Sequence, residues 1–371
     1  MSKVKTMWIP ELEGLRGFAS LWVFLGHVCI LAQCHIPILG SPSYGVDMFI
    51  LLSGFLMAKN YMEREGDEPW NSFRTAWNFW LRRFFRIAPL YYILLFVALC
   101  IGPFIGEMRA IIGSVDPSSA MDLTKFNDRT VANTIIHLSL FFGVLPYYSA
   151  NTALPDWSIS LEFQFYFLFP FIMFLVLKSG FRVVLFSLSA VSSILFFVFP
   201  DFYRAFNLPS FIFLKLPIFI AGMFIYYSVR SGRLLDLGIA FIVIIFSSVT
   251  GLYINGVQLI IQLIMCGLIF YIASNYNEDT RLKNKLKWLF NNRLSLFLGD
   301  VSYSVYLIHL LIVIPVSAYF IHHYNVQYDV PLLRFFKVLA VSIPIVYFLS
   351  VLTYSFVERP GVKFGKKVIN K

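Results

Sequence analysis

Long apolar runs separated by short polar segments dominate the chain. Ten runs approach or exceed the roughly 20 residues that an α-helix needs to cross a bilayer. They lie at 15–34, 44–62, 84–106, 158–178, 182–200, 209–229, 234–254, 256–275, 295–321 and 333–357. The pattern predicts an all-α, polytopic integral membrane protein with about ten transmembrane helices. Because ten is even, both termini are expected on the same side.

A further apolar segment at 131–146 is short, polar at intervals and flanked by acidic and aromatic residues. We predict an interfacial or re-entrant helix there. With the N-terminus inside, most of the 30 Lys and Arg fall in cytoplasmic segments, as the positive-inside rule requires. If 131–146 were a full span, the basic cluster at 281–287 would lie outside. We therefore expect ten spans and cytoplasmic termini.

Composition supports this class. The 371 residues are 58% hydrophobic and only 13% charged, which excludes an ordinary soluble domain. The net charge of +10 comes from basic residues between apolar runs, so it does not indicate nucleic-acid binding. The four cysteines have no paired metal-ligand spacing, and no metal site is expected. Without an internal repeat or a soluble segment, residues 1–371 are predicted to form a single membrane domain, with the first run retained as a span.

The first apolar run contains two ionisable residues, Arg16 and His27. Their spacing of eleven places them close to three helical turns apart, on one face and about 16 Å apart along the axis. Ionisable residues inside membrane helices usually face an interior site. Arg16 alone is also compatible with a cytoplasmic anchor whose side chain reaches the interface. His27 alone is compatible with a satisfied core histidine.

A pair of arginines precedes the third run. Arg83 and Arg86 are three residues apart, so they are neighbours on one helix face at its cytoplasmic end. Guanidinium groups in such a pair suit phosphate oxygens. An ordinary positive-inside flank is the alternative. Together with Arg16, the pair could bind one anionic ligand from the cytosol.

Two carboxylates lie at the outer ends of other spans. Glu162 is about one turn inside the run at 158–178, where a carboxylate needs a partner. Asp47 begins the second run and is either an interfacial cap or a partner that orients an imidazole. Both are expected near the depth of His27, and a carboxylate beside a histidine is typical of general acid–base chemistry. His309 is a second intramembrane histidine, catalytic or structural.

Six blocks in this order resemble acyltransferase family 3, the polytopic membrane acyltransferases that modify cell-surface glycans. The first includes the R-x10-H spacing of Arg16 and His27, and Arg83 and Arg86 match an R-x-x-R block. The blocks lie at 12–27, 45–55, 83–89, 157–166, 302–309 and 358–360. Each alone is weak, but together they span nearly the whole chain.

The resemblance implies transfer of an acyl group, most often acetyl, from cytosolic acyl-CoA to a hydroxyl of a surface polysaccharide or lipid-linked sugar. The donor would be acetyl-CoA, without a metal, and the location the bacterial cytoplasmic (inner) membrane. His27 would act as general base or carry the acyl group transiently. The remaining expected roles are catalytic for Glu162 and Asp47, CoA binding for Arg16, Arg83 and Arg86, and substrate binding for Trp157, Ser158, Tyr166 and His309.

The chain departs from the family pattern at two positions. Glu13 replaces a common Asp, and Phe163 replaces a frequent second Glu, so Glu162 lacks an adjacent carboxylate. The chain also ends at Lys371 without the extracellular hydrolase-like domain of some members. Transfer is therefore expected to finish in the membrane domain or on a separate protein. A transporter or flippase of lipid-linked saccharide, and a sugar-binding or assembly subunit without chemistry, remain alternatives.

Overall fold

The structure is a computed structural model that describes residues 8–117, 121–249, 255–274 and 280–369. All regular secondary structure in these ranges is helical, which confirms the predicted all-α class. Eight helices within them are long and apolar enough to cross a membrane. The protein is therefore a polytopic membrane protein.

These eight helices coincide with eight of the predicted spans. They are α1 (Pro10–Leu31), α3 (Phe73–Val115), α5 (Trp157–Ser179), α6 (Phe181–Val198), α8 (Ile212–Ser231), α10 (Gly256–Ala273), α13 (Ser302–Tyr324) and α14 (Pro331–Thr353), which continues through a π-helical turn at Tyr354–Glu358 into α15 (Arg359–Ile369). The other two predicted spans correspond to α2 (Pro42–Glu63), which is too polar to count among the eight, and to α9 (Leu234–Val249), which has only 16 residues. The total of ten spans stays a prediction.

Five segments differ from the expected pattern or add to it. Helix α3 has 43 residues and extends beyond the predicted run at both ends. The segment at 131–146 forms only the short helix α4 (Val131–Leu138) followed by two 3₁₀ turns. Shorter helices are α7 (Pro200–Arg204), α11 (Arg281–Phe290) and α12 (Arg293–Asp300), which meets α13 at residue 301.

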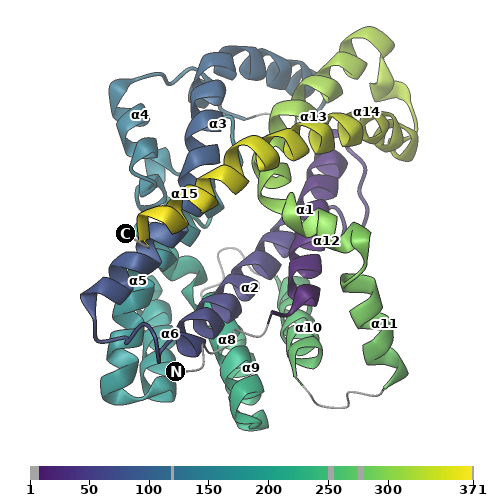
Figure 1. The fold of residues 1–371 in the computed structure, drawn as a ribbon. Coiled ribbons are helices and arrows are strands. Elements are labelled where there is room, and N and C mark those ends of the chain that lie inside the picture. The colour runs from purple at the N-terminus through teal and green to yellow at the C-terminus, as the bar shows by residue number, and fades with distance from the viewer. Residues whose placement is uncertain (1–7, 118–120, 250–254, 275–279, 370–371) are drawn as a thin grey trace.

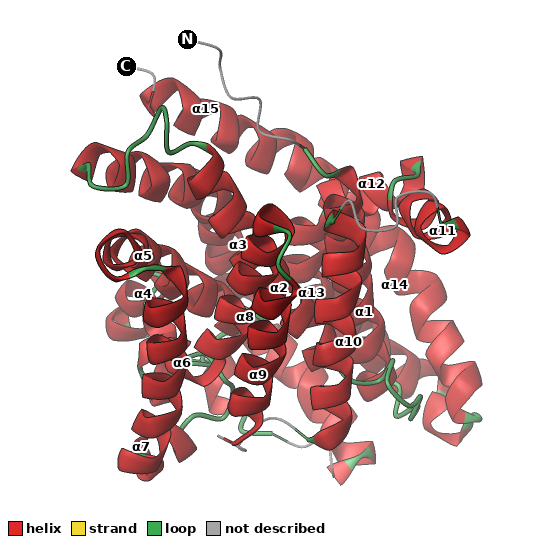
Figure 2. Cartoon of the chain, turned by 90° about the horizontal axis from the view of Figure 1, so that it is seen from below, coloured by secondary structure: helices red, strands yellow, loops and turns green. Residues whose placement is uncertain are grey.

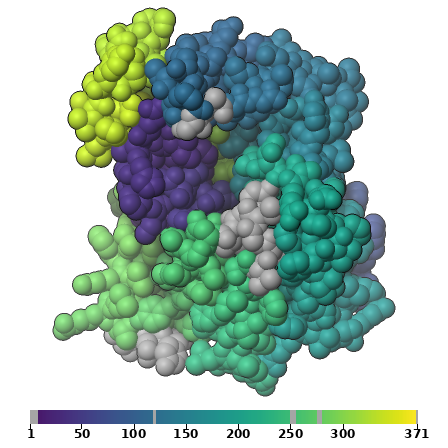
Figure 3. Space-filling model, turned by 180° about the vertical axis from the view of Figure 1, so that it is seen from behind, coloured from purple at the N-terminus to yellow at the C-terminus, as the bar shows by residue number. Residues whose placement is uncertain are grey.

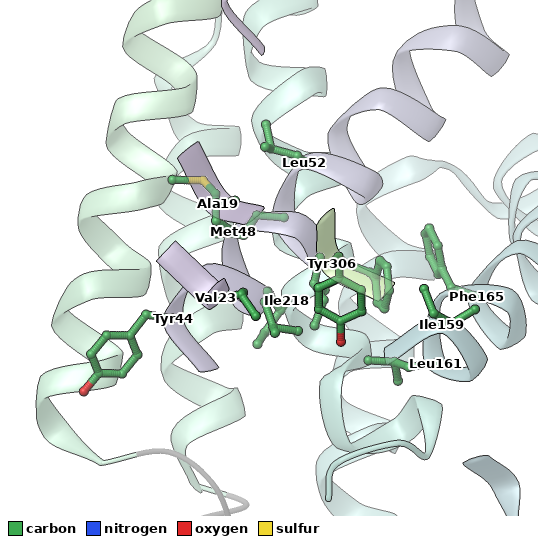
Figure 4. Packing of buried hydrophobic residues seen from close by; sticks show 14 of the residues in the cluster. Ala19, Val23, Tyr44, Met48, Leu52, Ile159, Leu161, Phe165, Ile218 and Tyr306 are labelled. Atoms are coloured by element: carbon green, nitrogen blue, oxygen red, sulfur yellow. The ribbon is translucent and has the colours of Figure 1, made fainter. Parts of the chain in front are cut away.

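Helices α1, α2, α8 and α13 form the centre of the bundle, and buried side chains from them and from α5 meet in one layer (Figure 4). Close contact between α2 and α8 depends on glycine. A Cβ at Gly54 would lie 2.0 Å from the carbonyl oxygen of Phe219, and one at Gly222 would lie 2.1 Å from that of Leu51. Small residues let membrane helices approach until dispersion contacts hold them. This packing aligns the spans that carry the site.

Helices α11, α12 and α15 gather at one end of the bundle, which we call the α15 face (Figure 2). The beginning of α1 belongs to this face, because Gly14 and Gly17 pack against Phe290 and Gly299 at the ends of α11 and α12. Helix α7 lies at the opposite end (Figure 2). Helix α15 continues from α14 and packs along α3 (Figure 1). The bundle therefore has two distinct ends, with the predicted site residues between them.

Candidate active site

A polar pocket opens between α1, α2, α3 and α5, and we call it the arginine pocket. Arg16, Arg83 and Arg86 all line it. Its other polar lining residues are Glu13, Ser53, Lys59, Asn60, Glu162 and Tyr166. The three arginines expected at an anion site thus lie together, contributed by two helices that are distant in the sequence.

The Arg83 guanidinium is incompletely bonded. It lies 5.6 Å from the ring centres of Phe79 and Tyr166, which give it cation–π contacts. Its Nε is buried and has no hydrogen-bond partner in the described ranges. Arg86, one turn further along α3, forms no hydrogen bond or ion pair with any described residue, whereas Arg16 pairs with Glu13 at 3.2 Å. A buried unsatisfied donor is costly, so a ligand oxygen fits here.

Glu162 lies between the arginine pocket and a deeper cavity. Its Oε1 accepts a hydrogen bond from Ser53 Oγ at 2.6 Å and another from the Tyr166 hydroxyl. The deeper cavity, which we call the central cavity, shares Arg16, Ser53 and Glu162 with the arginine pocket. Its further polar lining residues are Ser158, Ser302, Tyr303 and Tyr306. Polar groups therefore continue from the arginine pocket into the middle of the bundle.

His27 and His309 form a pair within the bundle. His309 Nδ1 lies 2.8 Å from the carbonyl oxygen of Tyr306 and 3.1 Å from that of Val305. Carbonyls only accept, so a neutral His309 carries its proton on Nδ1 and accepts at Nε2. His27 Nδ1 lies 3.1 Å from this Nε2 and 2.9 Å from the Val23 carbonyl, so it donates to both. The Nε2 of His27 is then an unprotonated base.

His27 lines a third cavity, the histidine pocket, with α1 on one side and the end of α3 and the segments at 121–126 and 149–157 on the others. Arg109 and Lys125 are the basic lining residues. Burial and the neighbouring Arg109 charge lower the pKa of Lys125. Figure 3 shows the purple surface of residues near the beginning of the described chain next to the blue surface of residues around the end of α3. The pocket is apolar along α1 and α13 and charged along α3.

Residues close to the histidine pair line both the histidine pocket and the central cavity. Trp157 lines the histidine pocket, and the next residue, Ser158, lines the central cavity. Ser158 Oγ donates to the Tyr306 hydroxyl at 2.6 Å. The Tyr306 ring centre lies 6.1 Å from that of His309. His27 thus lines the histidine pocket, and His309 lies near the Tyr306 ring that lines the central cavity.

Comparison with known proteins shows the family of the chain. Residues 9–351 match the family described as "Acyltransferase domain". The chain belongs to acyltransferase family 3. No solved structure matches it.

Named relatives of this family 3 chain are bacterial. It is 24% identical to "Putative O-acetyltransferase SACOL0978" of Staphylococcus aureus (strain COL), over 99% of this chain and 59% of the relative. It is 32% identical to "Acyltransferase MdmB" of Streptomyces mycarofaciens, over 44% and 38%. It is 29% identical to "Putative peptidoglycan O-acetyltransferase YrhL" of Bacillus subtilis (strain 168), over 46% and 24%. The chain thus spans about three fifths of the length of the Staphylococcus aureus relative.

Glu162 of this family 3 chain does not occupy the expected place. The sequence predicted it on the outer side beside His27, but it lines the arginine pocket and the central cavity. The reason is helical geometry. Glu162 is five residues after Trp157, which moves it about 7.5 Å along α5 and onto a different side of the helix. In the described ranges, the ring partner of His27 is His309.

Asp47 is also separate from the histidine pair. It is fully buried, and its Oδ1 accepts from Lys215 Nζ at 2.9 Å. Its Oδ2 accepts from Gln258 Nε2 at 2.5 Å and from Gln262 Nε2 at 2.7 Å. These donors occupy both carboxylate oxygens, and they join α2 to α8 and α10. The expected bond from Asp47 to His27 is not formed, and its geometry is that of a structural ion pair.

The four expected substrate-binding residues lie in different cavities. Trp157 lines the histidine pocket, Ser158 the central cavity and Tyr166 the arginine pocket. His309 is fully buried, and its ring contacts His27 rather than an open cavity. Only Trp157 is therefore placed next to His27 in a pocket as expected.

Several polar groups around the site escaped the sequence analysis. Lys215 lies in the apolar run at 209–229. A single charged residue in such a run indicates a buried partner of opposite charge. His137 and Asp156 form a second buried pair beside the histidine pocket, with Nε2 and Oδ2 4.0 Å apart. Arg109 lies near the end of the long helix α3, beyond the predicted run at 84–106. Nothing in its local sequence indicated that it lines the histidine pocket.

Proposed function

We propose that this protein transfers an acetyl group from acetyl-CoA in the arginine pocket to a hydroxyl of a surface polysaccharide or lipid-linked sugar in the histidine pocket. Its location would be the cytoplasmic membrane of a bacterium, as befits its bacterial relatives. The observation that carries the proposal is the hydrogen-bonded His27–His309 pair beside the histidine pocket, in a bundle that also holds a pocket lined by three arginines.

The arginine pocket fits a phosphorylated donor. The unbonded Arg83 Nε and the free Arg86 supply donors for phosphate oxygens, and guanidinium groups hold such oxygens with charge-assisted bonds. The α15 face would be cytosolic, because α11 and α15 carry basic residues without any acidic ones. The arginine pocket includes Glu13 and Ile9 at the beginning of α1, so it would open to the same side.

His27 would act as the general base. Its Nε2 takes the proton from the acceptor hydroxyl while the hydroxyl oxygen attacks the thioester carbonyl carbon. The carbon–sulfur bond then breaks, and the CoA thiolate leaves and takes up the proton. His309 Nε2 accepts from His27 Nδ1–H, which keeps the ring oriented and stabilises the imidazolium that forms. Glu162 would organise the path between the pockets through Ser53 and Tyr166.

Membranes that contain the protein, given radiolabelled acetyl-CoA and the cell's own envelope glycans, would test the reaction. We expect one free CoA thiol for each base-labile O-acetyl ester formed. The control is a His27→Ala membrane at equal protein abundance, with His35→Ala as the matched variant, since His35 is exposed away from the pockets. Equal ester formation by wild type and His27→Ala would contradict the proposal. Saccharide translocation without ester formation would instead indicate a flippase.

A further inference from the structure

A second basic groove adjoins the arginine pocket. It lies between α3 and α15 and is lined by Arg82, Arg83 and Arg86 from one helix and by Gly365 and Lys366 from the other. Arg83 and Arg86 also line the arginine pocket. We call the second space the α15 groove. Because the two spaces share these two residues, an anion bound by Arg83 and Arg86 is next to the α15 groove.

The cations of the α15 groove differ in how far carboxylates compensate their charge. Arg82 is neutralised by Glu68, whose two carboxylate oxygens accept from its Nη1 and Nη2 at 2.7 Å each. Lys366 forms no hydrogen bond or ion pair with any residue that the structure describes. Glu358 is the acidic residue nearest to α15 in the sequence, and it accepts from Ser304. No Asp or Glu lines the groove itself.

Helix α15 is held in place rather than loosely attached. A Cβ at Gly365 would lie 2.7 Å from Phe85 Cβ, and one at Gly361 would lie 2.9 Å from Pro89 Cγ. The rings of Phe85 and Phe364 meet edge to face with centroids 5.4 Å apart. Two glycines four residues apart are typical of close helix packing in membranes. The position of Lys366 relative to the arginines of α3 is therefore fixed by packing.

The chemistry of the donor suggests what the groove binds. Coenzyme A has a diphosphate next to its pantetheine arm and a separate phosphate on the ribose 3′ oxygen, at the end away from the thiol. With the thioester directed through the central cavity toward His27, the diphosphate falls at Arg83 and Arg86. The 3′-phosphate then falls further out, where Lys366 offers an unpaired ammonium group.

We propose that the α15 groove, with Lys366 as its cation, binds the 3′-phosphate of the CoA donor. The inference rests on the proposed function, because it requires that CoA be the donor. It adds a residue of the C-terminal helix to the donor site. It also predicts that the protein distinguishes CoA from 3′-dephospho-CoA, which has the same diphosphate and thiol.

The test is a calorimetric binding measurement with CoA and 3′-dephospho-CoA on the full chain in detergent. For wild type we expect CoA to bind at least about tenfold more tightly, the effect of a single charge-assisted contact. In Lys366→Ala the difference between the two ligands should fall below about threefold, with dephospho-CoA affinity unchanged. The matched control is Lys363→Ala, which removes an exposed lysine of the same helix outside the groove and should keep the full difference.

The possible outcomes separate this inference from the proposed function. If wild type binds neither ligand, the proposed function fails. If both bind and the ratio of their affinities is the same in wild type and Lys366→Ala, the proposed function stands and the 3′-phosphate site is wrong. A second arm measures association with vesicles that contain anionic phospholipid. If Lys366→Ala weakens that association and leaves the ligand ratio unchanged, the groove binds a lipid phosphate and the inference is overturned.

Discussion

His309 holds the His27 ring in a fixed orientation. Two backbone carbonyls hold the proton of His309 on Nδ1, and its Nε2 accepts from His27 Nδ1–H at 3.1 Å. A buried ring would otherwise choose its tautomer by the Val23 carbonyl alone. The Val23 carbonyl and His309 therefore both favour the tautomer with a free Nε2, and His309, 282 positions away in the sequence, also fixes the orientation of the ring. His309 is thus a positioning residue.

His309→Ala should reduce kcat about tenfold or more and leave the KM for acetyl-CoA unchanged. The reason is that it removes the acceptor of a hydrogen bond to a ring that becomes charged, an interaction worth about 1.5–3 kcal/mol. His309→Gln should restore part of kcat, because the amide oxygen can accept in place of Nε2. His323→Ala, at the exposed end of the same helix, is the control. Equal changes in kcat and KM, or no rescue by Gln, would argue for a purely structural role.

Asp47 should contribute to stability rather than to transfer. Asp47→Ala leaves the buried Lys215 ammonium without its carboxylate, and breaking such a pair costs about 3–5 kcal/mol. We expect a marked loss of thermal stability in detergent. Lys215→Met in the same chain should recover much of it. The exposed pair of Asp329 and Lys337 is the control, since Asp329→Ala should cost less than about 1 kcal/mol. A stable, inactive Asp47→Ala protein would instead support a catalytic Asp47.

Helix packing at the centre of the bundle tolerates no side chain at Gly54. A Cβ there would lie 2.0 Å from the Phe219 carbonyl oxygen, so α2 and α8 must separate. Gly54→Ala should lower the unfolding temperature and the activity together, because the arginine pocket and the central cavity take walls from α2. Gly238→Ala is the matched control on α9, where nothing lies within 4 Å of an added Cβ. If Gly54→Ala has the same unfolding temperature as the control, the close contact between α2 and α8 is not formed.

The sequence readily predicts which segments are helices, but not which side of each helix faces its neighbours. Most apolar runs became helices near the expected bounds, because length and hydropathy largely decide membrane insertion. Helix α3 extends beyond its run, and the run at 295–321 is divided between α12 and α13. The predicted position of Glu162 was wrong. Its distance in the sequence gives its depth along α5, but not the side of the helix on which it lies. The meeting of His27 with His309 could not be predicted at all, since it depends on α1 and α13 packing together. The convergence of Arg16 with Arg83 followed from shared depth and charge, which the sequence does show.

The molecule's two ends should lie on opposite sides of the membrane. The basic helix α11 is predicted on the inner side of the membrane, and the segment that follows α3 is predicted on the outer side. Lys285 in α11 and Asn127 in that segment are both exposed. In a background without the four native cysteines, Lys285→Cys should be protected from an impermeant reagent in intact cells, and Asn127→Cys should react. Labelling of both positions, or of Lys285→Cys alone, would overturn the ten-span arrangement with cytoplasmic termini.

In the proposed mechanism, the donor binds in the arginine pocket and acyl transfer takes place at His27, at the other end of the same path. The decisive measurement is the acetyl-CoA affinity of purified His27→Ala and Arg86→Ala, each determined beside its transfer rate. Arg86→Ala should bind the donor about ten- to a hundredfold more weakly, the effect of a lost charge-assisted phosphate contact. His27→Ala should bind it within about twofold of wild type and transfer no acetyl group. Normal donor affinity in Arg86→Ala, together with weakened affinity or normal transfer in His27→Ala, would contradict the account.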